Sequence, residues 1–388
     1  MPHIGRWAGL VFTLVVAGCA KDDSILRVAA DVTGPSIVPV DSLVLREQDS
    51  LPLGAFTSFF DRDAAGRTFV NDMQDARLVA FGADGGFLWA SGTRGDGPGQ
   101  YQVPSAVEVV AHGALLAVFD VRRRTLSLVD SRTGAFRRSL PTEFQDVGTN
   151  WVIAGDTVLF APHMAAVLGA RWITTSDRVT TLGATPTRLL SAPDVTLRHG
   201  RPSIIPYEHG FLVALPATPR LLVLDSLGGQ RGQIALPAAR RKGESARLFD
   251  AGSRGTQAGM GMLGSSLYGL ARLASGEIAV VFLDMDVVKG DGGRARFENF
   301  KLYLSIVKPD LSAVCVDGMI PVTTDVAPLP VFVGDTLFTL ARQVSTGTAV
   351  RSVIYGYRVS SEGCEWQPTG GVLPPSPLDS SAAAQPRP

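Results

Sequence analysis

The sequence predicts an all-β fold, a six-bladed β-propeller of four-stranded antiparallel blades. The first observation is a hairpin pattern in which an apolar run reaches a turn and a second apolar run leaves it. The second is recurrence, because six such turns follow one another at intervals of 46, 47, 48, 85 and 52 residues. The third is a further apolar pair upstream of the turns, which supplies two more strands per repeat. The acidic residues of the six turns are Asp84, Asp130, Asp177, Asp225, Asp310 and Glu362.

A four-stranded antiparallel sheet with this pattern cannot bury both of its faces alone. Stacking such sheets around an axis hides the faces and leaves only short edges, which is the arrangement of a propeller. The composition agrees, because 42 Gly and 25 Pro are somewhat high, as in a turn-rich all-β chain.

The first clear repeat is the hairpin at residues 78–89, with an Asp-Gly-Gly turn at Asp84. A Gly- and Pro-rich loop at 92–101 then leads to the next predicted strand at 103–110. The glycines of this loop are expected to serve turns. Its polar and aromatic residues Arg94, Asp96 and Tyr101 are the candidate binding residues.

The interval of 85 residues between Asp225 and Asp310 needs a separate explanation. Much of it lacks strand alternation, which indicates two insertions into the fifth blade, at residues 238–265 and 286–299. This enlarged blade is the best candidate for a special surface. The alternative is that the interval hides another blade, which would make seven.

The closure of the ring is predicted from residues 37–46, which precede the first blade and show the alternation of a strand. We expect this strand to pair with the last blade and to join the two ends of the chain. The propeller is therefore assigned to residues 37–368. Residues 369–388 contain few apolar groups and are expected to form a disordered tail.

The chain begins with a predicted export signal at residues 1–18, in which Arg6 precedes an apolar core of 11 residues. That core is shorter than the ~20 residues that span a bilayer and has the length of a signal peptide core. The following Val16-Ala17-Gly18-Cys19 resembles the lipobox of bacterial lipoproteins. The resemblance implies lipidation of Cys19, a tether at 19–36, and, with Ala20 in place of the inner-membrane retention Asp, an outer-membrane location. An ordinary signal peptide that happens to contain Cys19 is the alternative.

The link at residues 95–104, Gly-Asp-Gly-Pro-Gly-Gln-Tyr-Gln-Val-Pro, resembles the G-x-G-P-G-x-F-x-x-P link of NHL-type repeats. The stretch at 67–81 also resembles a blade of that family and of related six-bladed bacterial lipoproteins. This resemblance implies a propeller with a binding role and no particular reaction. It is specific in the first blade, and only the spacing of the hairpins extends it to about residue 368.

Two cysteines remain once Cys19 is set aside. Export would allow Cys315 and Cys364 to form a disulfide. The predicted register places both on outermost strands of neighbouring blades, which diverge, whereas a bridge needs Cα atoms within about 7 Å. The register therefore argues partly against a bridge, and the pairing stays open.

Three local patterns resemble cofactor or metal sites, but the surrounding sequence does not support such a site in any of them. The G-x-G-x-x-G at residues 259–264 lacks the preceding buried strand of a dinucleotide site, so no cofactor is expected. The acidic stretch 61–72 lacks part of the charge of a calcium loop and is better explained as a turn between the first two strands of a blade. His112, His163, His199 and His209 have no partner at metal spacing, so no metal is expected.

These observations favour a binding or interaction module over an enzyme. The 36 basic and 36 acidic residues give no net charge, which argues against a nucleic-acid surface. We expect the protein to be attached to the membrane through its lipid anchor. Its expected partner is an envelope protein, a peptide or a glycan. The alternatives are a propeller hydrolase or lyase with an axial active site, whose catalytic residues the sequence does not identify, and a structural member of an envelope complex.

Overall fold

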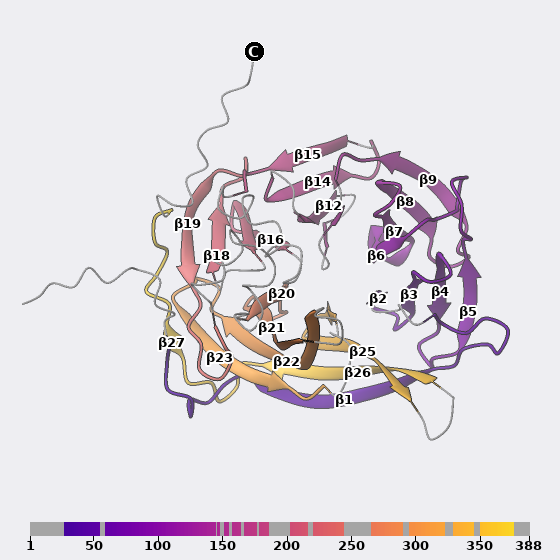
Figure 1. Ribbon diagram of the computed structural model, residues 1–388. Coiled ribbons are helices and arrows are strands. Elements are labelled where there is room, and N and C mark those ends of the chain that lie inside the picture. The colour runs from indigo at the N-terminus through magenta and orange to yellow at the C-terminus, as the bar shows by residue number, and fades with distance from the viewer. Residues whose placement is uncertain are drawn as a thin grey trace, which may run out of the picture.

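The computed structural model is a ring of six β-sheets around a central axis, shown in Figure 1. Each sheet has at least four antiparallel strands, so the predicted six-bladed β-propeller is confirmed and the seven-bladed alternative is excluded. Helix among the described residues is limited to one 3-10 turn, η1 (Ala111–Gly113). The structure describes residues 27–54, 59–144, 146–147, 151–154, 157–163, 167–176, 178–185, 202–215, 220–243, 265–289, 295–322, 329–344 and 350–375.

The first three blades follow the chain in order, with the innermost strand first. Blade one contains β2 (Phe60–Arg62), β3 (Thr68–Asp72), β4 (Arg77–Phe81) and β5 (Phe87–Ser91); blade two contains β6 (Pro104–Val110), β7 (Leu115–Asp120), β8 (Thr125–Asp130) and β9 (Phe136–Pro141); blade three contains β11 (Val152–Ala154), β12 (Thr157–Phe160), β14 (Gly169–Ile173) and β15 (Arg178–Leu182). A small pair, β10 (Asp146–Val147) with β13 (Pro162–His163), accompanies blade three.

Blade four keeps this pattern, whereas blades five and six differ from it at their outer edges. Blade four contains β16 (Ser203–Tyr207), β17 (Gly210–Ala214), β18 (Arg220–Leu224) and β19 (Gln230–Ala235); blade five contains β20 (Ser266–Arg272), β21 (Ile278–Lys289), β22 (Ala295–Val307), β23 (Ala313–Ile320) and β27 (Gln367–Pro368); blade six contains β24 (Pro330–Val333), β25 (Thr336–Val344), β26 (Val350–Ser360) and β1 (Ser36–Leu45). Blade five thus has a fifth strand, and blade six takes its outermost strand from the start of the described chain.

The hydrophobic core is divided into six clusters, one at each boundary between neighbouring blades. The middle strands bury both faces, and every residue of β3 and β4 is buried. A strand covered on both sides reads as a continuous apolar run rather than a simple alternation. This explains why runs such as that at residues 78–81 mark the centre of a blade.

Closure of the ring matches the prediction from residues 37–46. Strand β1 pairs antiparallel with β26 from Ser36 opposite Ser360 to Leu45 opposite Ser352. Leu45 is 3% exposed and belongs to the cluster between blades six and one. The two ends of the propeller are therefore joined within one sheet, which leaves no unpaired edge at the join.

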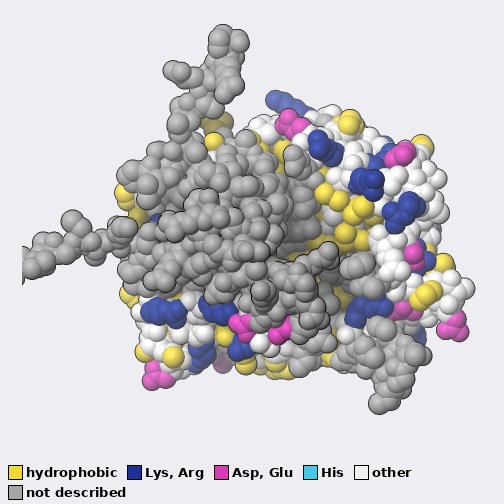
Figure 2. Space-filling model, in the orientation of Figure 1, with side chains coloured by type: hydrophobic (Ala, Val, Ile, Leu, Met, Phe, Trp, Pro, Cys, Tyr) yellow, Lys and Arg dark blue, Asp and Glu magenta, His cyan; other side chains and the backbone are white. Residues whose placement is uncertain are grey.

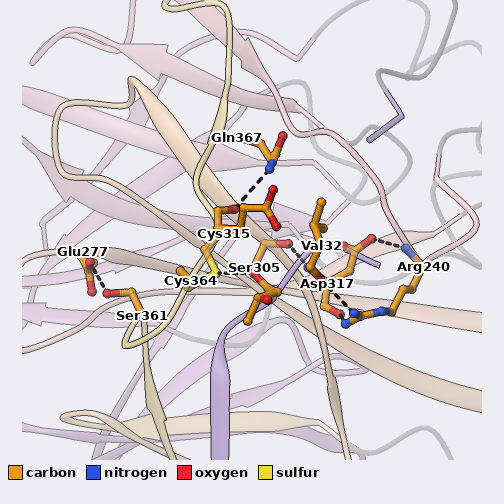
Figure 3. The surroundings of a disulfide bond; sticks show 11 residues. Val32, Arg240, Glu277, Ser305, Cys315, Asp317, Ser361, Cys364 and Gln367 are labelled. Carbon is orange, nitrogen blue, oxygen red and sulfur yellow. Dashed lines mark hydrogen bonds between the residues drawn. A yellow bond between two sulfur atoms is a disulfide. The ribbon is translucent and has the colours of Figure 1, made fainter. Parts of the chain in front are cut away.

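The segment after β26 does not continue blade six. It crosses to blade five, where β27 pairs with β23 through Val314 opposite Gln367. Cys364 of this segment forms a disulfide with Cys315 of β23, and the two Cα atoms are 5.7 Å apart (Figure 3). The predicted register placed Cys364 on an outermost strand of blade six and was wrong there, because β1 occupies that position.

Blade five is enlarged, as predicted, but partly by strand rather than loop. The hairpin of β21 and β22 continues through residues 286–289 and 295–298, with Asp286 opposite Glu298 and Lys289 opposite Ala295. The insertion predicted at 286–299 is thus largely an extension of the sheet. Of the insertion predicted at 238–265, residues 244–264 lie outside the described residues.

Residues 27–35, predicted to belong to a tether, lie against blade five and the segment that leads into it. Arg240 donates from Nη2 to the Val32 carbonyl at 2.9 Å (Figure 3) and from Nε to the Ala30 carbonyl at 3.1 Å. Gly34 makes the close approach possible, since a Cβ there would lie 2.6 Å from the Val316 carbonyl oxygen. Residues 1–26, including Cys19, lie outside the described residues.

Residues 369–375 fall within the predicted disordered tail, yet they pack on blades four and five. The Thr369 hydroxyl donates to the Leu311 carbonyl at 2.6 Å. Leu373 and Gln233 of β19 exchange two backbone hydrogen bonds of 2.9 Å each. The described chain therefore covers part of the outer edge of blade four before it ends at residue 375.

Candidate axial pocket

The six innermost strands surround a pocket of about 600 Å³ on the axis of the ring. Every blade contributes to its wall, so the closed ring is what forms it. The described lining residues are Asp61 of blade one, Glu108 of blade two, Trp151 and Val152 of blade three, Ile205 to Glu208 of blade four, Leu270 to Arg272 of blade five, and Val331, Phe332 and Gly334 of blade six.

The pocket lies toward one end of the ring. Innermost strands of an up-and-down propeller run in the same direction, so their last residues meet at the same end. Glu208, Arg272 and Gly334 lie beside or within the first turn of their blades. Asp61 and Glu108 come slightly earlier along β2 and β6, which places them deeper than that rim.

Asp61 connects the innermost strands of blades one and two. Its Oδ2 accepts a hydrogen bond from the Val109 amide at 2.6 Å, and its Oδ1 accepts one from the Arg62 amide at 2.7 Å. Innermost strands of neighbouring blades belong to different sheets and share no ladder. A carboxylate that accepts two backbone N–H groups supplies a polar link between them.

Glu108 continues this chain of contacts to blade three. Its Oε1 accepts a hydrogen bond from the Trp151 amide at 3.2 Å. The Asp61 carboxyl also lines this pocket. Two carboxyl side chains from neighbouring blades therefore lie in the same pocket wall.

Burial raises the pKa of Asp61 from 3.8 to about 6. The hydrogen bonds from the Val109 and Arg62 amides and the contact with Glu108 oppose this rise, and the negative charge of Asp63 adds to it. Asp61 is only 8% exposed, so loss of water around the charged form outweighs the backbone donors. The side chain consequently exchanges its proton near neutral pH.

The opposite wall is formed by blades four, five and six. Arg272 donates from Nη2 to the Pro206 carbonyl at 3.3 Å and joins blade five to blade four. The Tyr207 hydroxyl donates to the Pro309 carbonyl at 2.9 Å, so its ring faces the pocket while its polar end is already bonded. Phe332 adds a half-buried aromatic side chain from blade six.

The described lining thus combines three carboxyl groups, one guanidinium and the rings of Trp151, Tyr207 and Phe332. Carboxylates accept hydrogen bonds from hydroxyl and ammonium groups, and aromatic rings contact the apolar faces of sugars or organic cations. Among the described residues no group of three or more His, Cys, Asp or Glu side chains could hold a metal ion. The arrangement can hold a small polar ligand with donor groups.

The predicted binding residues lie elsewhere. Arg94 is exposed and donates to the carbonyls of Gln74 and Gln102 at 2.7 and 3.0 Å, and the Asp96 side chain is 80% exposed. Tyr101 is 2% exposed and belongs to the core cluster between blades one and two. None of the three lines the axial pocket, and the loop is built as a link between blades.

Other sequence features also have structural roles. Asp63 accepts hydrogen bonds from the amides of Gly66 and Arg67, which confirms the predicted turn between the first two strands of the blade. His112 lies in η1 with a positive φ of 52°, and His209 is exposed in the turn after β16. The G-x-G-x-x-G at 259–264 lies outside the described residues.

Reasoning from the sequence missed Asp61 and Glu108 as pocket residues. The available signal was a carboxylate within a strand that is otherwise apolar, as in Ala106-Val107-Glu108-Val109-Val110. A second missed signal is the Asp that ends the second strand of blades one and two, at Asp72 and Asp120. Asp120 accepts hydrogen bonds from the Gln102 and Val103 amides of the incoming link, at 2.6 and 3.2 Å.

No family model matches this chain, and no curated protein matches it either. Comparison with solved structures finds proteins of similar fold at low sequence identity. A member of the DUF4221 family from Bacteroides vulgatus is 8% identical with a TM-score of 0.58, covering 84% of this chain and 99% of that one. A protein from Bacteroides fragilis named as a putative exported protein is 11% identical with a TM-score of 0.55, covering 86% and 99%. The WD40 repeats of RRP9 are 11% identical with a TM-score of 0.51, covering 83% and 100%.

These likenesses concern the fold. They agree with the six-bladed ring and assign no ligand or reaction to the pocket. Within the described residues, no helix has the length and apolar character needed to span a bilayer. Figure 2 shows one face of the molecule, in the orientation of Figure 1. Among the described residues of this face the basic and acidic side chains are interspersed, without a broad field of one sign.

Proposed function

We propose that this protein is a lipid-anchored binding module of the cell envelope that holds a segment of a peptide or glycan partner in its axial pocket. The observation that carries this proposal is the pocket of about 600 Å³ to which every blade contributes. Ligand sites are typically concave, largely preformed and lined by apolar groups with a few converging polar ones. The axial pocket has each of these properties.

The rigidity of the ring supports a binding role. Asp61, Glu108 and Arg272 each join innermost strands of neighbouring blades. Their side chains are therefore held in place before any ligand arrives, which limits the conformational entropy lost on binding. Loops alone would not hold polar groups in this way.

Binding would be tested on arrays of envelope glycans and short peptides with the purified protein. Glu208→Ala and Arg272→Ala change the rim of the pocket without touching the core, since both side chains are exposed. Glu143→Ala and Arg132→Ala are matched controls on exposed positions of blade two. Loss of binding in the first pair alone supports the proposal, and equal binding by all four variants would overturn it.

Attachment to the membrane through Cys19 is the second part of the proposal. The lipobox-like Val16-Ala17-Gly18-Cys19 supports it, as does the description of one structural neighbour as a putative exported protein. Radioactive palmitate should label the wild type and fail to label Cys19→Ala, while Cys315→Ser remains labelled. Equal labelling of wild type and Cys19→Ala would remove the anchor from the proposal.

A hydrolase or lyase with an axial active site is the second candidate. The specific observation in its favour is Asp61, whose pKa of about 6 and position beside Glu108 in the lining of the pocket suit general acid–base chemistry. Ligands found on the arrays would be incubated with the protein and followed by mass spectrometry. Conversion that is lost in Asp61→Asn favours the enzyme, and recovery of intact ligand favours the binding module.

A further inference from the structure

We infer that the end of the ring opposite the axial pocket lies against the membrane to which the lipid anchor attaches the protein, so that the pocket opens away from the bilayer. This inference rests on the anchor in the proposed function and adds the surface that meets the lipid. The innermost strands begin at this end, named the root end here, and finish at the pocket end.

The first described residues join the ring at the root end. Strand β19, the fourth strand of blade four, runs toward that end, and residues 236–243 follow it. The Val28 amide donates to the Ala238 carbonyl of this link at 3.1 Å, and Arg27 Nη1 donates to the Arg241 carbonyl at 3.4 Å. The chain that comes from Cys19 therefore reaches the ring at the end farther from the pocket mouth.

The segment that follows Arg27 is fixed to the body of the ring. The Val32 side chain is 5% exposed and belongs to the core cluster between blades four and five. Its carbonyl accepts the hydrogen bond from Arg240 that Figure 3 shows. The Thr33 carbonyl accepts one from the Glu365 amide at 3.0 Å, directly after the disulfide at Cys364. The point from which the anchor leaves the ring is therefore set by packing and by a covalent bridge.

The chain between the anchor and this fixed point is short. Residues 20–26 separate Cys19 from Arg27, and a fully extended chain of that length reaches about 27 Å. The innermost strand β6 has 7 residues, which corresponds to a height of about 23 Å. Crossing the height of the ring would use nearly all of the available chain. A lipid on Cys19 therefore keeps the root end beside the bilayer.

The pocket is open toward the opposite end. Glu208 and Gly334 lie in the first turns of their blades and line its mouth. Toward the root end, the axis narrows to a cavity of about 10 Å³, whose wall includes Phe60, Ala106 and Pro330 at the starts of innermost strands. That is about the space of one water molecule. A ligand reaching the pocket from the pocket end does not meet the membrane in this orientation.

Exposed cations lie where the chain joins the root end. Arg27, Arg240 and Lys242 are all exposed. The hydrogen bonds of the two arginines go to backbone carbonyls, which carry no net charge, and Lys242 forms an ion pair of 2.6 Å with Asp286. Anionic lipid head groups attract such cations. The chemistry at this point suits the phosphate groups of a bilayer surface.

The test compares fluorescent probes at the two ends of one blade. Arg122 precedes β8 at the root end and Arg132 follows it at the pocket end, and both are exposed. Arg122→Cys and Arg132→Cys each add one thiol, because Cys19 is acylated and Cys315 is bonded to Cys364. The labelled lipoprotein is inserted into vesicles of phosphatidylethanolamine and phosphatidylglycerol that contain a lipid with a nitroxide quencher on its head group.

A second pair examines the side of the ring where the chain joins it. Lys301→Cys places a probe near the root end of blade five, and Ser226→Cys places one at the pocket end of blade four. Both positions are exposed. Thermal melting checks that every labelled variant is folded, and the same probes in Cys19→Ala protein give the fluorescence without attachment.

Flotation of the vesicles measures attachment, and quenching measures orientation. The loss of fluorescence should be more than roughly twofold larger at Arg122→Cys than at Arg132→Cys, since the 6 residues of β8 separate their positions by about 20 Å. It should likewise be larger at Lys301→Cys than at Ser226→Cys. Equal or reversed quenching within either pair, in protein that floats, would overturn the inference and leave the proposed anchor and binding role intact. Protein that does not float would overturn the anchor, and the inference with it.

Discussion

Cys315 and Cys364 join the outer edge of blade five to the segment that leaves blade six, with their Cα atoms 5.7 Å apart. The bridge lies within one edge of one blade rather than between two diverging blades. It is possible because β1 supplies the outermost strand of blade six and thereby frees the segment after β26 to cross over. The disulfide and β1 together hold the first strand of the ring and the segment after β26 on the last two blades.

Replacing the bridge, in Cys315→Ser with Cys364→Ser, should lower the free energy of unfolding by about 2–4 kcal/mol. The bridged residues are 49 apart in the sequence, so their separation gives the unfolded chain considerable freedom. Chemical denaturation with and without a reducing agent measures the effect. The reducing agent should destabilise the wild type and leave the double variant unchanged; a wild type indifferent to reduction would contradict the prediction.

The buried ion pair of Arg241 and Asp317 should respond unequally to removal of either partner. Arg241 Nε lies 2.9 Å from Asp317 Oδ1, and both side chains are fully buried. Burial lowers the pKa of Arg241, and the neighbouring Asp317 counteracts this. Asp317 also accepts hydrogen bonds from the amides of Ala239, Arg240 and Arg241, at 2.5, 2.8 and 3.2 Å.

Asp317→Asn should therefore cost about 3–5 kcal/mol, because it leaves a buried guanidinium without its counter-charge. Asparagine tolerates the positive φ of 53° at this position, so the loss reports on the charge and the acceptor oxygen of the side chain rather than on the backbone. Arg241→Met should cost less, since the carboxylate keeps three backbone donors and Met fills the space beside Phe282. Urea denaturation of both variants measures the difference, and an equal or reversed order would show that the backbone donors do not sustain the carboxylate.

The architecture was accessible from the sequence because it depends on local patterns. Acidic turns between apolar runs recur wherever two outer strands of a blade meet, and Asp84 and Asp130 both lie in such turns. Asp84 accepts a hydrogen bond from the amide two residues later, and Asp130 accepts from the amides two and three residues later. The signal is therefore contained in a few neighbouring positions. Closure by β1 was also predictable, because this strand precedes the first blade and can complete the last blade by pairing with it.

The pocket was less accessible because it depends on contacts between blades. Asp61 and Glu108 are 47 positions apart in the sequence, and their presence in one pocket wall follows from the ring geometry. The crossing of the chain after β26 also depends on contacts distant in the sequence. Strand β1 occupies the outer edge of blade six, so the segment after β26 pairs with blade five. Tyr101 illustrates the converse, because an aromatic residue in a Gly-rich loop resembles a contact residue and is instead buried.

The closing strand should contribute stability through one side chain that can be tested with a neighbouring control. Leu45 of β1 is 3% exposed, whereas the adjacent Val44 is 44% exposed. Leu45→Ala should lower the free energy of unfolding by about 2–5 kcal/mol because it leaves a cavity between blades six and one. Val44→Ala should change it by no more than about 0.5 kcal/mol. Similar losses in thermal and urea denaturation for the two variants would mean that β1 is not packed into the core.

Asp61 should make the protein less stable as the pH rises through about 6. Its pKa is raised from 3.8 to about 6 in the folded protein, so the folded state binds the proton more tightly than the unfolded state does. The contribution is fully present below about pH 4 and is lost as the pH passes 6. A shift of this size corresponds to about 3 kcal/mol.

Asp61→Asn should flatten this fall in the free energy of unfolding between pH 4 and pH 7. The amide can accept only one of the two backbone hydrogen bonds, which adds a loss of about 1 kcal/mol that does not depend on pH. Asp310→Asn is the control of opposite sign, because hydrogen bonds from Ser312 lower the pKa of that exposed carboxyl. Its removal should reduce stability above about pH 4 rather than relieve a loss. Urea denaturation at pH 4, 5, 6 and 7 measures both, and a wild-type curve parallel to that of Asp61→Asn would show that Asp61 keeps an ordinary pKa.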